Sequence, residues 1–582
     1  MRIGAAGGPS TRRVETAIFI RSHILIPLAI LCLYLAAFSL LLPAGVNKVF
    51  VTRSMQVLLP ITALLWVSFL VATGLAKVKA ARVETPEDRL AAGDATLLLL
   101  PLVPVVQYLL LNSDILSFTD AVVVLGIFAL FSALLVLVVP LLLQKTGSAR
   151  PVMYMALAFT FLITNMAAAA KDHNWHDWVS LQILLPLFAA IALGSWLLFR
   201  LGLRTVLHVV ILAFFVTNGL VVLRTRLASA SSPGAPPAPS RLVALVESRQ
   251  PQSMPGIYLL IYDSYVPSET MAGYGIDNVP QEQYLEQSGF TLYPNTYSID
   301  AGSLKTMSRV LNASPSYLID RDGRTAVAGG GTILQLLKEY GYETYGVFPS
   351  DFNFRGTVPT YDTYFPGPSS SAGLLIGAIL EGEFRFDIGF DRVSREVFLQ
   401  EKERLFSTPS DHPKFVYSHS VLPGHSQVPT CGTVELTAFR DDVAEANREM
   451  RLDIQTILDH DPDAIIVVAG DHGPRLTKNC DRTEGVYDLS EISRLDIQDR
   501  FGTFLAIHWP SQDFEAYDQI TVLQDLFPAI FAYMFKDPAL LQARFNPATV
   551  SDGMISGARV IDGIIVGGAD DGEPLFTGGA DQ

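Results

Sequence analysis

The amino-terminal part of the chain is dominated by apolar runs, and this feature limits most strongly what the chain can fold into. A membrane-spanning helix needs about 20 mostly apolar residues. Seven such runs precede residue 226, near residues 23–43, 55–76, 95–112, 119–143, 152–170, 179–199 and 204–223. We therefore predict that residues 1–226 form a membrane anchor with about seven transmembrane helices. Further runs follow the first, which favours an anchor over a cleaved signal peptide.

Positive charges fall in alternate loops between these runs. They precede the first run and follow the second, fourth and sixth, at Arg2, Arg12, Arg13, Arg21, Lys77, Lys79, Arg82, Arg89, Lys145, Arg150, Arg200 and Arg204. The other loops contain only Lys48, Arg53 and Lys171. The positive-inside rule then predicts a multi-pass protein of the inner (cytoplasmic) membrane with a cytoplasmic N-terminus. An odd number of spans places everything after residue 226 in the periplasm or outside the cell.

The rest of the chain is acidic. Residues 1–226 hold 17 Lys and Arg against 9 Asp and Glu, a net charge of +8, so the remainder carries 25 against 48, or −23. A surface this acidic repels phosphate backbones, so we expect no nucleic-acid partner. An Ala/Ser/Pro-rich stretch predicts an extended linker, which we place at residues 227–254. Residues 255–582 are long enough for one large globular domain.

Short apolar runs alternate with helical patterns in this second part. We predict strands at residues 257–262, 343–348, 414–420, 464–470 and 503–510, and helices at residues 303–312, 332–342 and 435–459. Such alternation indicates an α/β domain with a mixed, mostly parallel central sheet flanked by helices. In sheets of this kind, functional side chains gather at the carboxyl ends of the strands.

Three residues with metal-binding side chains follow two of the predicted strands. Asp263 comes directly after the run IYLLIY, and Asp471 and His472 come directly after AIIVVAG. A single Asp in such a position is most often a turn or helix-capping residue, and a single His is most often structural. Two carboxylates and an imidazole at the same edge of a sheet instead favour a divalent-metal site.

A hydroxyl group opens a predicted helix between these segments. Ser303 begins the stretch SLKTMSRVLN, after Ala301 and Gly302. The amino end of a helix offers free N–H groups and partial positive charge, which suit a phosphate or sulfate group. A serine there can act as a nucleophile if a metal lowers its pKa. On this stretch alone, a helix-capping role for Ser303 is the better reading.

The order of these features resembles the sulfatase-like branch of the alkaline phosphatase superfamily. It is most similar to the membrane-bound sulfatase-like hydrolases and transferases, whose relatives include lipoteichoic acid synthases and the phosphoethanolamine and phosphoglycerol transferases. The resemblance covers roughly residues 255–512 and the anchor. In these families the nucleophile stands eight residues before a Leu-(Thr/Asn) pair. The matching position here is Ser303, and Thr306 is the reserve candidate for the nucleophile. It implies that Asp263, Ser303, Asp471 and His472 share one divalent metal, Mn²⁺ first and Mg²⁺, Ca²⁺ or Zn²⁺ as alternatives.

The resemblance also implies substrate-binding residues. Relatives carry a His-rich, Pro-containing segment that contacts the transferred group, and HSVLPGH at residues 419–425 occupies that place. We choose His425 as the catalytic and substrate-binding histidine, with His419 as the alternative. Arg475 resembles an Arg that often follows Asp-His-Gly and could bind an anionic substrate. Arg500 is a weaker candidate for the same role.

Two departures from the family pattern limit the reaction type and the number of metals that we expect. Formylglycine sulfatases need a Pro or Ala and an Arg after the nucleophile, whereas Ser303 is followed by Leu-Lys-Thr-Met, so that route to sulfate-ester hydrolysis is disfavoured. The usual Asp-Asp after the first strand is Asp263-Ser264, which supports one metal rather than two. Cys431 and Cys480 could pair as a disulfide in an oxidising compartment or remain free thiols.

Three functions remain open at this point. The first is a metal-dependent phospho-group transferase that uses Ser303 on phospholipid head groups, with membrane lipids and an exported glycan or lipid acceptor as partners. The second is a sulfatase-like hydrolase of phosphate or sulfate esters, which differs only in the acceptor. The third is an inactive sulfatase-like domain that serves as a binding or assembly module. A transporter is disfavoured because charged residues are nearly absent from the apolar runs.

Overall fold

The structure, a computed structural model, describes residues 240–317, 320–354, 357–367, 393–426, 433–478 and 487–578, and before them residues 102, 105–106, 109 and 118–133. The chain divides into two units. The first holds α5 (Phe118–Ala133). None of the described helices combines the length and the apolar character needed to cross a membrane. The predicted spans lie largely outside the described residues, and Cys431 and Cys480 lie outside them entirely.

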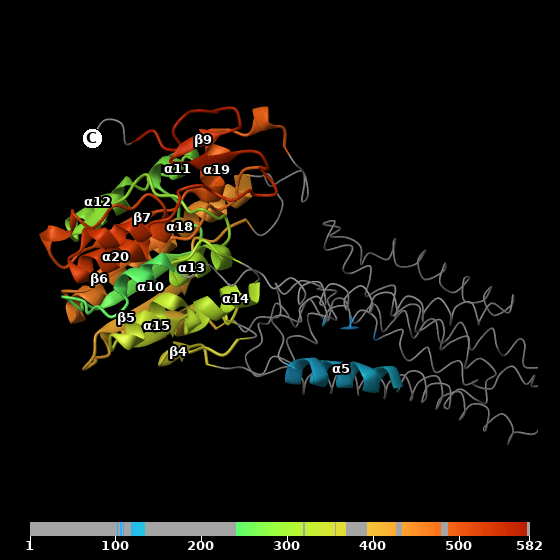
Figure 1. Cartoon of the computed structure of the whole chain (residues 1–582). Helices are drawn as coiled ribbons and strands as arrows, with labels where there is room; N and C mark the ends of the chain where they lie inside the picture. Colours follow the sequence, from blue (N-terminus) through green and yellow to red (C-terminus); the bar gives the residue numbers. More distant parts are fainter. Residues whose placement is uncertain are drawn as a thin grey trace, which may run out of the picture. The chain divides into compact units, whose positions relative to one another are not determined.

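The second unit is built on a seven-stranded sheet with the order β2-β7-β6-β1-β5-β3-β4 (Figure 1). Its strands are β1 (Ile257–Tyr262), β2 (Phe290–Leu292), β3 (Glu343–Val347), β4 (Thr363–Phe365), β5 (Lys414–Ser420), β6 (Ile465–Gly470) and β7 (Leu505–His508). The neighbours β6, β1, β5, β3 and β4 are parallel, whereas β7 is antiparallel to β6 and β2. The predicted mixed, mostly parallel sheet is confirmed. A separate pair, β8 (Arg559–Ile561) and β9 (Ile564–Val566), is antiparallel.

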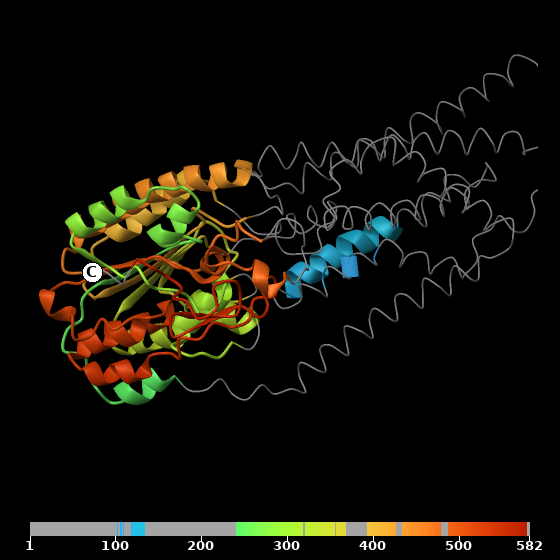
Figure 2. The same cartoon turned by 90° about the horizontal axis from the view of Figure 1, so that it is seen from above.

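Helices cover both faces of the large sheet (Figure 2). Those on one face are α10 (Arg241–Val246), α13 (Ser303–Asn312), α15 (Thr332–Glu339) and α20 (Leu526–Phe535), and those on the other are α11 (Ser268–Gly273), α12 (Val279–Gln287), α17 (Arg395–Ser407) and α18 (Thr433–His460). Two further helices are α14 (Asp320–Thr325) and α19 (Arg494–Phe501). The predicted helices at residues 303–312, 332–342 and 435–459 correspond to α13, α15 and α18.

Strand β1 lies in the middle of the sheet and is buried along its whole length. Its side chains alternate between the two faces. Ile257, Leu259 and Ile261 join the apolar core beneath α13, α15 and α20, whereas Tyr258, Leu260 and Tyr262 join the core beneath α17 and α18. A strand buried on both faces explains why the sequence shows a continuous apolar run instead of a polar–apolar alternation.

Part of the segment predicted as a linker is packed against this domain. Within residues 227–254, the chain forms α10, whose Leu242 and Val246 are buried in the same core as α20. Just after it, the Arg249 guanidinium donates to Asp537 at 2.8 Å, and the backbone N–H of Gln252 donates to the Met534 carbonyl at 2.8 Å. The chain from residue 240 onward is therefore docked on the domain rather than extended. The predicted boundaries at residues 226 and 254 otherwise stay predictions.

A buried ion cluster lies against the last residue of β1. The ammonium group of Lys402, on α17, lies 2.7 Å from Glu449 Oε1 and also donates to Asp453, both on α18. The Tyr262 hydroxyl donates to Asp453 Oδ2 at 2.6 Å. Burial acts to lower the pKa of Lys402, but the two carboxylates outweigh it and raise the pKa, so the side chain stays charged. The cluster ties α17 and α18 to the end of β1.

We expect the substitution Lys402→Met to destabilise the domain by about 3–5 kcal/mol, because Asp453 would lose its cation while remaining buried. The control is Lys338→Met, which removes an ion pair with Asp362 whose side chains are 34% and 45% exposed. That change should cost less than about 1 kcal/mol. Urea denaturation followed by circular dichroism measures the free energy of unfolding of both variants. Equal losses of stability would show that the buried cluster contributes no more than an exposed ion pair.

Candidate metal centre

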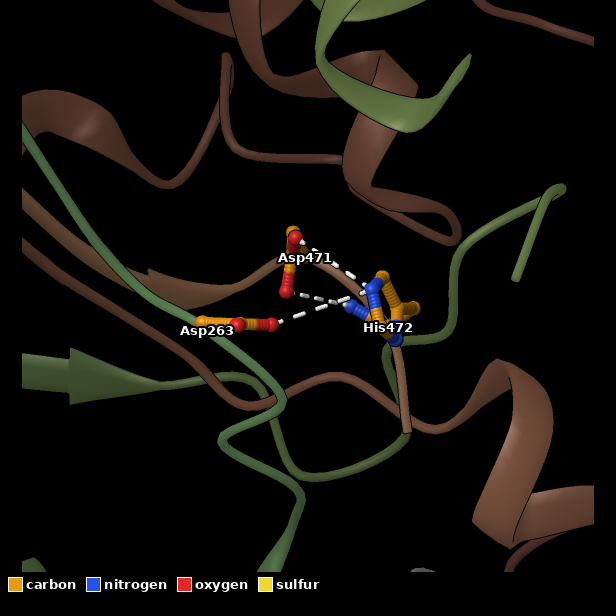
Figure 3. A group of neighbouring side chains, drawn as sticks. All are labelled: Asp263, Asp471 and His472. Carbon is orange, nitrogen blue, oxygen red and sulfur yellow. Dashed lines mark hydrogen bonds and ion pairs between the residues drawn. The ribbon is translucent and has the colours of Figure 1, made fainter. Parts of the chain in front are cut away.

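Asp263, Asp471 and His472 converge at the carboxyl edge of the large sheet. One ligand atom from each lies within 4.8 Å of the others. His472 Nε2 is 3.8 Å from Asp263 Oδ1 and 3.6 Å from Asp471 Oδ2. Figure 3 shows the three side chains pointing toward one another from the ends of two strands. The sequence placed these residues at one edge, and the structure brings their side chains together.

The strand register produces this convergence. Tyr262, the last residue of β1, is aligned with Ser420 of β5 and with Gly470 of β6. Asp263 directly follows β1 and Asp471 directly follows β6. The two carboxylates therefore lie side by side at the carboxyl edge of the sheet. The backbone N–H of Asp263 donates to the Ser420 carbonyl at 3.1 Å and continues the ladder by one bond.

One oxygen of Asp471 is satisfied and the other is not. Asp471 Oδ1 accepts the backbone N–H groups of Ser264 at 2.9 Å and of His472 at 3.0 Å. Asp471 Oδ2 is buried and has no hydrogen-bond partner within the described part of the chain. A buried carboxylate oxygen without a partner is costly. A cation beside it would remove that cost, so this atom fits a metal ligand.

The tautomer of His472 leaves Nε2 free to bind a metal or to accept a hydrogen bond. His472 Nδ1 lies 2.8 Å from the Gly473 carbonyl, which can only accept, so Nδ1 carries the hydrogen. Nε2 then presents a lone pair. Burial is the largest influence on this imidazole and lowers the pKa of His472, which keeps the ring neutral near pH 7.

Ser303 faces that lone pair. It is the first residue of α13, and its hydroxyl lies 3.0 Å from His472 Nε2. The hydroxyl therefore donates to the imidazole. Thr306, the reserve nucleophile, is placed differently: its side chain is fully buried, 2.9 Å from the Ser298 hydroxyl, and it donates to the Asp300 carbonyl at 3.1 Å. The structure thus brings Ser303 to the three candidate ligands and leaves the Thr306 hydroxyl engaged elsewhere.

Both predicted histidines of the 419–425 segment lie beside the centre. The His425 ring is 5.8 Å from the His472 ring, centroid to centroid, and its Nδ1 donates to the Ser426 carbonyl at 3.0 Å. His419 Nε2 lies 3.6 Å from Asp471 Oδ2, and the Tyr417 hydroxyl is 2.8 Å from His419 Nδ1. His425 thus lies next to the imidazole of His472, and His419 lies next to the carboxylate of Asp471.

The two candidate arginines have different surroundings. The guanidinium of Arg475 donates to the Ala301 carbonyl, just before α13, which places it near Ser303. Arg500 is almost fully buried, and its guanidinium donates to Asp499 at 3.3 Å and to the Thr477 carbonyl at 3.1 Å. Arg475 keeps its predicted role as a substrate-binding candidate. Arg500 instead holds the loop that follows Asp-His-Gly.

Two residues of the centre were missed by the sequence analysis. Asp499 accepts the backbone N–H groups of Leu476 at 2.9 Å and of Thr477 at 3.0 Å, and so fixes the loop after His472. That loop passes so close that a Cβ at Gly473 would lie 2.2 Å from the Asp499 carbonyl. The other missed residue is Ser264, which contacts all three candidate ligands. Its position directly after a strand-ending Asp was the available signal; for Asp499 the sequence carried none.

No family model and no curated protein matches this sequence. Several solved structures are similar to it. The integral membrane protein lipooligosaccharide phosphoethanolamine transferase A of Neisseria meningitidis is 13% identical, with 76% of this chain and 95% of that chain covered and a TM-score of 0.36. The C-terminal periplasmic domain of EptC from Escherichia coli, in complex with Zn, is 14% identical, with coverages of 50% and 83% and a TM-score of 0.32. A protein in the alkaline phosphatase superfamily from Vibrio parahaemolyticus is 17% identical, with coverages of 56% and 79% and a TM-score of 0.34.

We expect Asp471→Asn to abolish saturable binding of Mn²⁺ and Zn²⁺, because an amide nitrogen would replace Oδ2, a buried oxygen with no hydrogen-bond partner among the described residues. Isothermal titration calorimetry on chelator-treated protein measures this.

The matched control is Asp461→Asn, since Asp461 bonds to the Tyr258 hydroxyl at the amino edge of the same sheet. This control should bind metal as the wild type does. Unchanged metal binding in Asp471→Asn would contradict the assignment of the centre.

Proposed function

We propose that this chain is a membrane-anchored enzyme of the sulfatase-like branch of the alkaline phosphatase superfamily, and that it transfers a phospho group by way of Ser303. The observation that carries the proposal is the position of the Ser303 hydroxyl, 3.0 Å from the Nε2 atom of His472, beside two carboxylates. A nucleophile, a neutral imidazole and a pair of acidic oxygens meet at one edge of a rigid sheet. This arrangement supports the site that the resemblance implied.

The donor set fits one divalent cation. Asp263, Asp471, His472 and Ser303 would hold it through two carboxylate oxygens, one imidazole nitrogen and one hydroxyl oxygen. Such a mixture suits Mn²⁺ best in our proposal, with Mg²⁺, Ca²⁺ or Zn²⁺ as alternatives. A bound cation would lower the pKa of the serine hydroxyl and stabilise negative charge on the phosphoryl oxygens.

The reaction proceeds in two displacements at phosphorus. In the first, Ser303 Oγ, its proton lost to solvent, bonds to phosphorus as the bond from phosphorus to the leaving alcohol breaks. The leaving oxygen takes the electron pair and accepts a proton from His425. In the second, an acceptor hydroxyl gives its proton to His425 and bonds to phosphorus. The bond to Ser303 Oγ then breaks, and the serine takes up a proton from solvent.

The remaining residues and the anchor define the substrate class. Arg475, next to the start of α13, binds an anionic oxygen of the substrate. The predicted membrane anchor supplies phospholipid head groups as donors, and an exported glycan or lipid serves as the acceptor. The predicted periplasmic placement agrees with this. With water as acceptor, the same two displacements amount to hydrolysis.

We expect Ser303→Ala to reduce turnover by at least about 10³-fold, because the covalent route is lost. Metal binding should persist, since the two carboxylates and the imidazole remain. The control is Ser308→Ala in the same helix, whose hydroxyl donates only to the Lys305 carbonyl; it should retain activity. Turnover can be followed with a chromogenic phosphodiester and added Mn²⁺, and full activity in Ser303→Ala would refute the nucleophile.

A transferase and a hydrolase are separated by the acceptor. We expect the full-length protein with Mn²⁺ to release the head-group phosphate of a lipid donor faster when glycan or lipid acceptors are supplied than in water alone. Thin-layer chromatography of labelled phospholipid measures both products. Equal rates would favour a hydrolase, and cleavage of a sulfate ester at a comparable rate would extend it to sulfatase activity. A protein that binds no divalent metal would instead be an inactive binding module.

A further inference from the structure

Ser264, the residue after Asp263, sits in an unfavourable backbone conformation. Its φ is +61°, in the left-handed region, and its side chain is fully buried. A residue with a Cβ pays a conformational cost in this region, and glycine does not. A turn that served only to redirect the chain would favour glycine here. The presence of a serine therefore points to a use for its hydroxyl.

Three of the four candidate metal ligands, Asp263, Asp471 and His472, have a contact with Ser264. The backbone N–H of Ser264 donates to Asp471 Oδ1 at 2.9 Å. Its hydroxyl oxygen lies 3.0 Å from Asp263 Oδ1 and 3.4 Å from His472 Nδ1. A carboxylate can only accept, so the Ser264 hydroxyl donates to Asp263.

These contacts fix which atoms face the centre. The N–H of Ser264 occupies Asp471 Oδ1 and so leaves the partnerless Oδ2 toward His472. The hydroxyl bond limits rotation of the Asp263 carboxylate, whose Oδ1 is the oxygen 3.8 Å from His472 Nε2. The backbone bond survives any substitution, whereas the hydroxyl bond depends on the serine side chain.

We propose that Ser264 is a positioning residue that orients the metal-binding carboxylates, and that it is not itself a ligand. The inference rests on the proposed metal site. The left-handed conformation of Ser264 directs its N–H toward Asp471 and its hydroxyl toward Asp263 at the same time. Groups that hold ligands in place in this manner typically change metal affinity by about 10–100-fold when they are removed.

The test measures metal binding by full-length Ser264→Gly and Ser264→Ala after chelator treatment, with Mn²⁺ and Zn²⁺ titrated separately by calorimetry. We expect the Kd of both variants to rise by about 10–100-fold. Ser264→Gly should unfold, without metal, at a temperature no lower than the wild type, because glycine adopts this φ freely. The control is Ser418→Ala, which removes a buried hydroxyl that has no hydrogen-bond partner among the described residues; its Kd should equal that of the wild type.

The outcomes are separable. Wild-type affinity in Ser264→Gly would overturn the positioning role and leave only a conformational one, even if Ser264→Ala binds weakly or fails to fold. A wild type that binds neither metal would instead overturn the proposed metal site, and the positioning role with it. A raised Kd in Ser264→Gly together with an unchanged or higher metal-free unfolding temperature supports the proposal, because lost folding stability could not explain it.

Discussion

The parallel pairing of β1 with β5 on one side and β6 on the other is the constraint on which the rest of the domain depends. It aligns Tyr262 with Ser420 and with Gly470, so the three strands end together. A slip of one residue would send every side chain of β1 to the opposite face. The apolar cores on both faces and the convergence of Asp263 with Asp471 are therefore set by the same register. The same packing that fixes the strand register thus fixes the position of the centre.

The centre itself is locally unfavourable. It contains a buried carboxylate oxygen without a partner, at Asp471, and two non-glycine residues with left-handed backbones, Ser264 and Arg475. Strain of this kind persists only where the surrounding structure fixes it, and it is concentrated at functional sites. The loops after β1 and β6 carry all three features, whereas the strands themselves are regular and fully buried. The scaffold supplies the stability that the centre lacks.

Much of this arrangement could be predicted from local sequence patterns. The runs at residues 257–262 and 464–470 are continuous and bounded by polar residues, so the strands and the residues that end them were evident. Asp263, Asp471 and His472 followed from their positions at the ends of these strands, whereas Ser303 was selected only by the resemblance to the sulfatase-like enzymes. The role of Asp499 could not be predicted, because it depends on bonds to a segment more than 20 residues away. For Ser264 the position after Asp263 was a signal, but its bond to Asp471 joins residues far apart in the sequence. Helix α10 was not distinguished from the linker, because it is short and depends on packing against parts of the domain that are distant in sequence.

The docking of α10 has a mechanical consequence. Helix α10 precedes β1 in the chain, so a force applied at residue 240 passes through α10 before it reaches β1. Two sets of contacts would bear that force before β1 does. They are the apolar contacts of Leu242 and Val246 and the Arg249–Asp537 ion pair. They join α10 and the turn after it to α20 and its neighbours, at a distance in sequence of nearly 300 residues. A pull at residue 240 would thus be resisted by α10, and β1, the strand that precedes Asp263, would not be stretched.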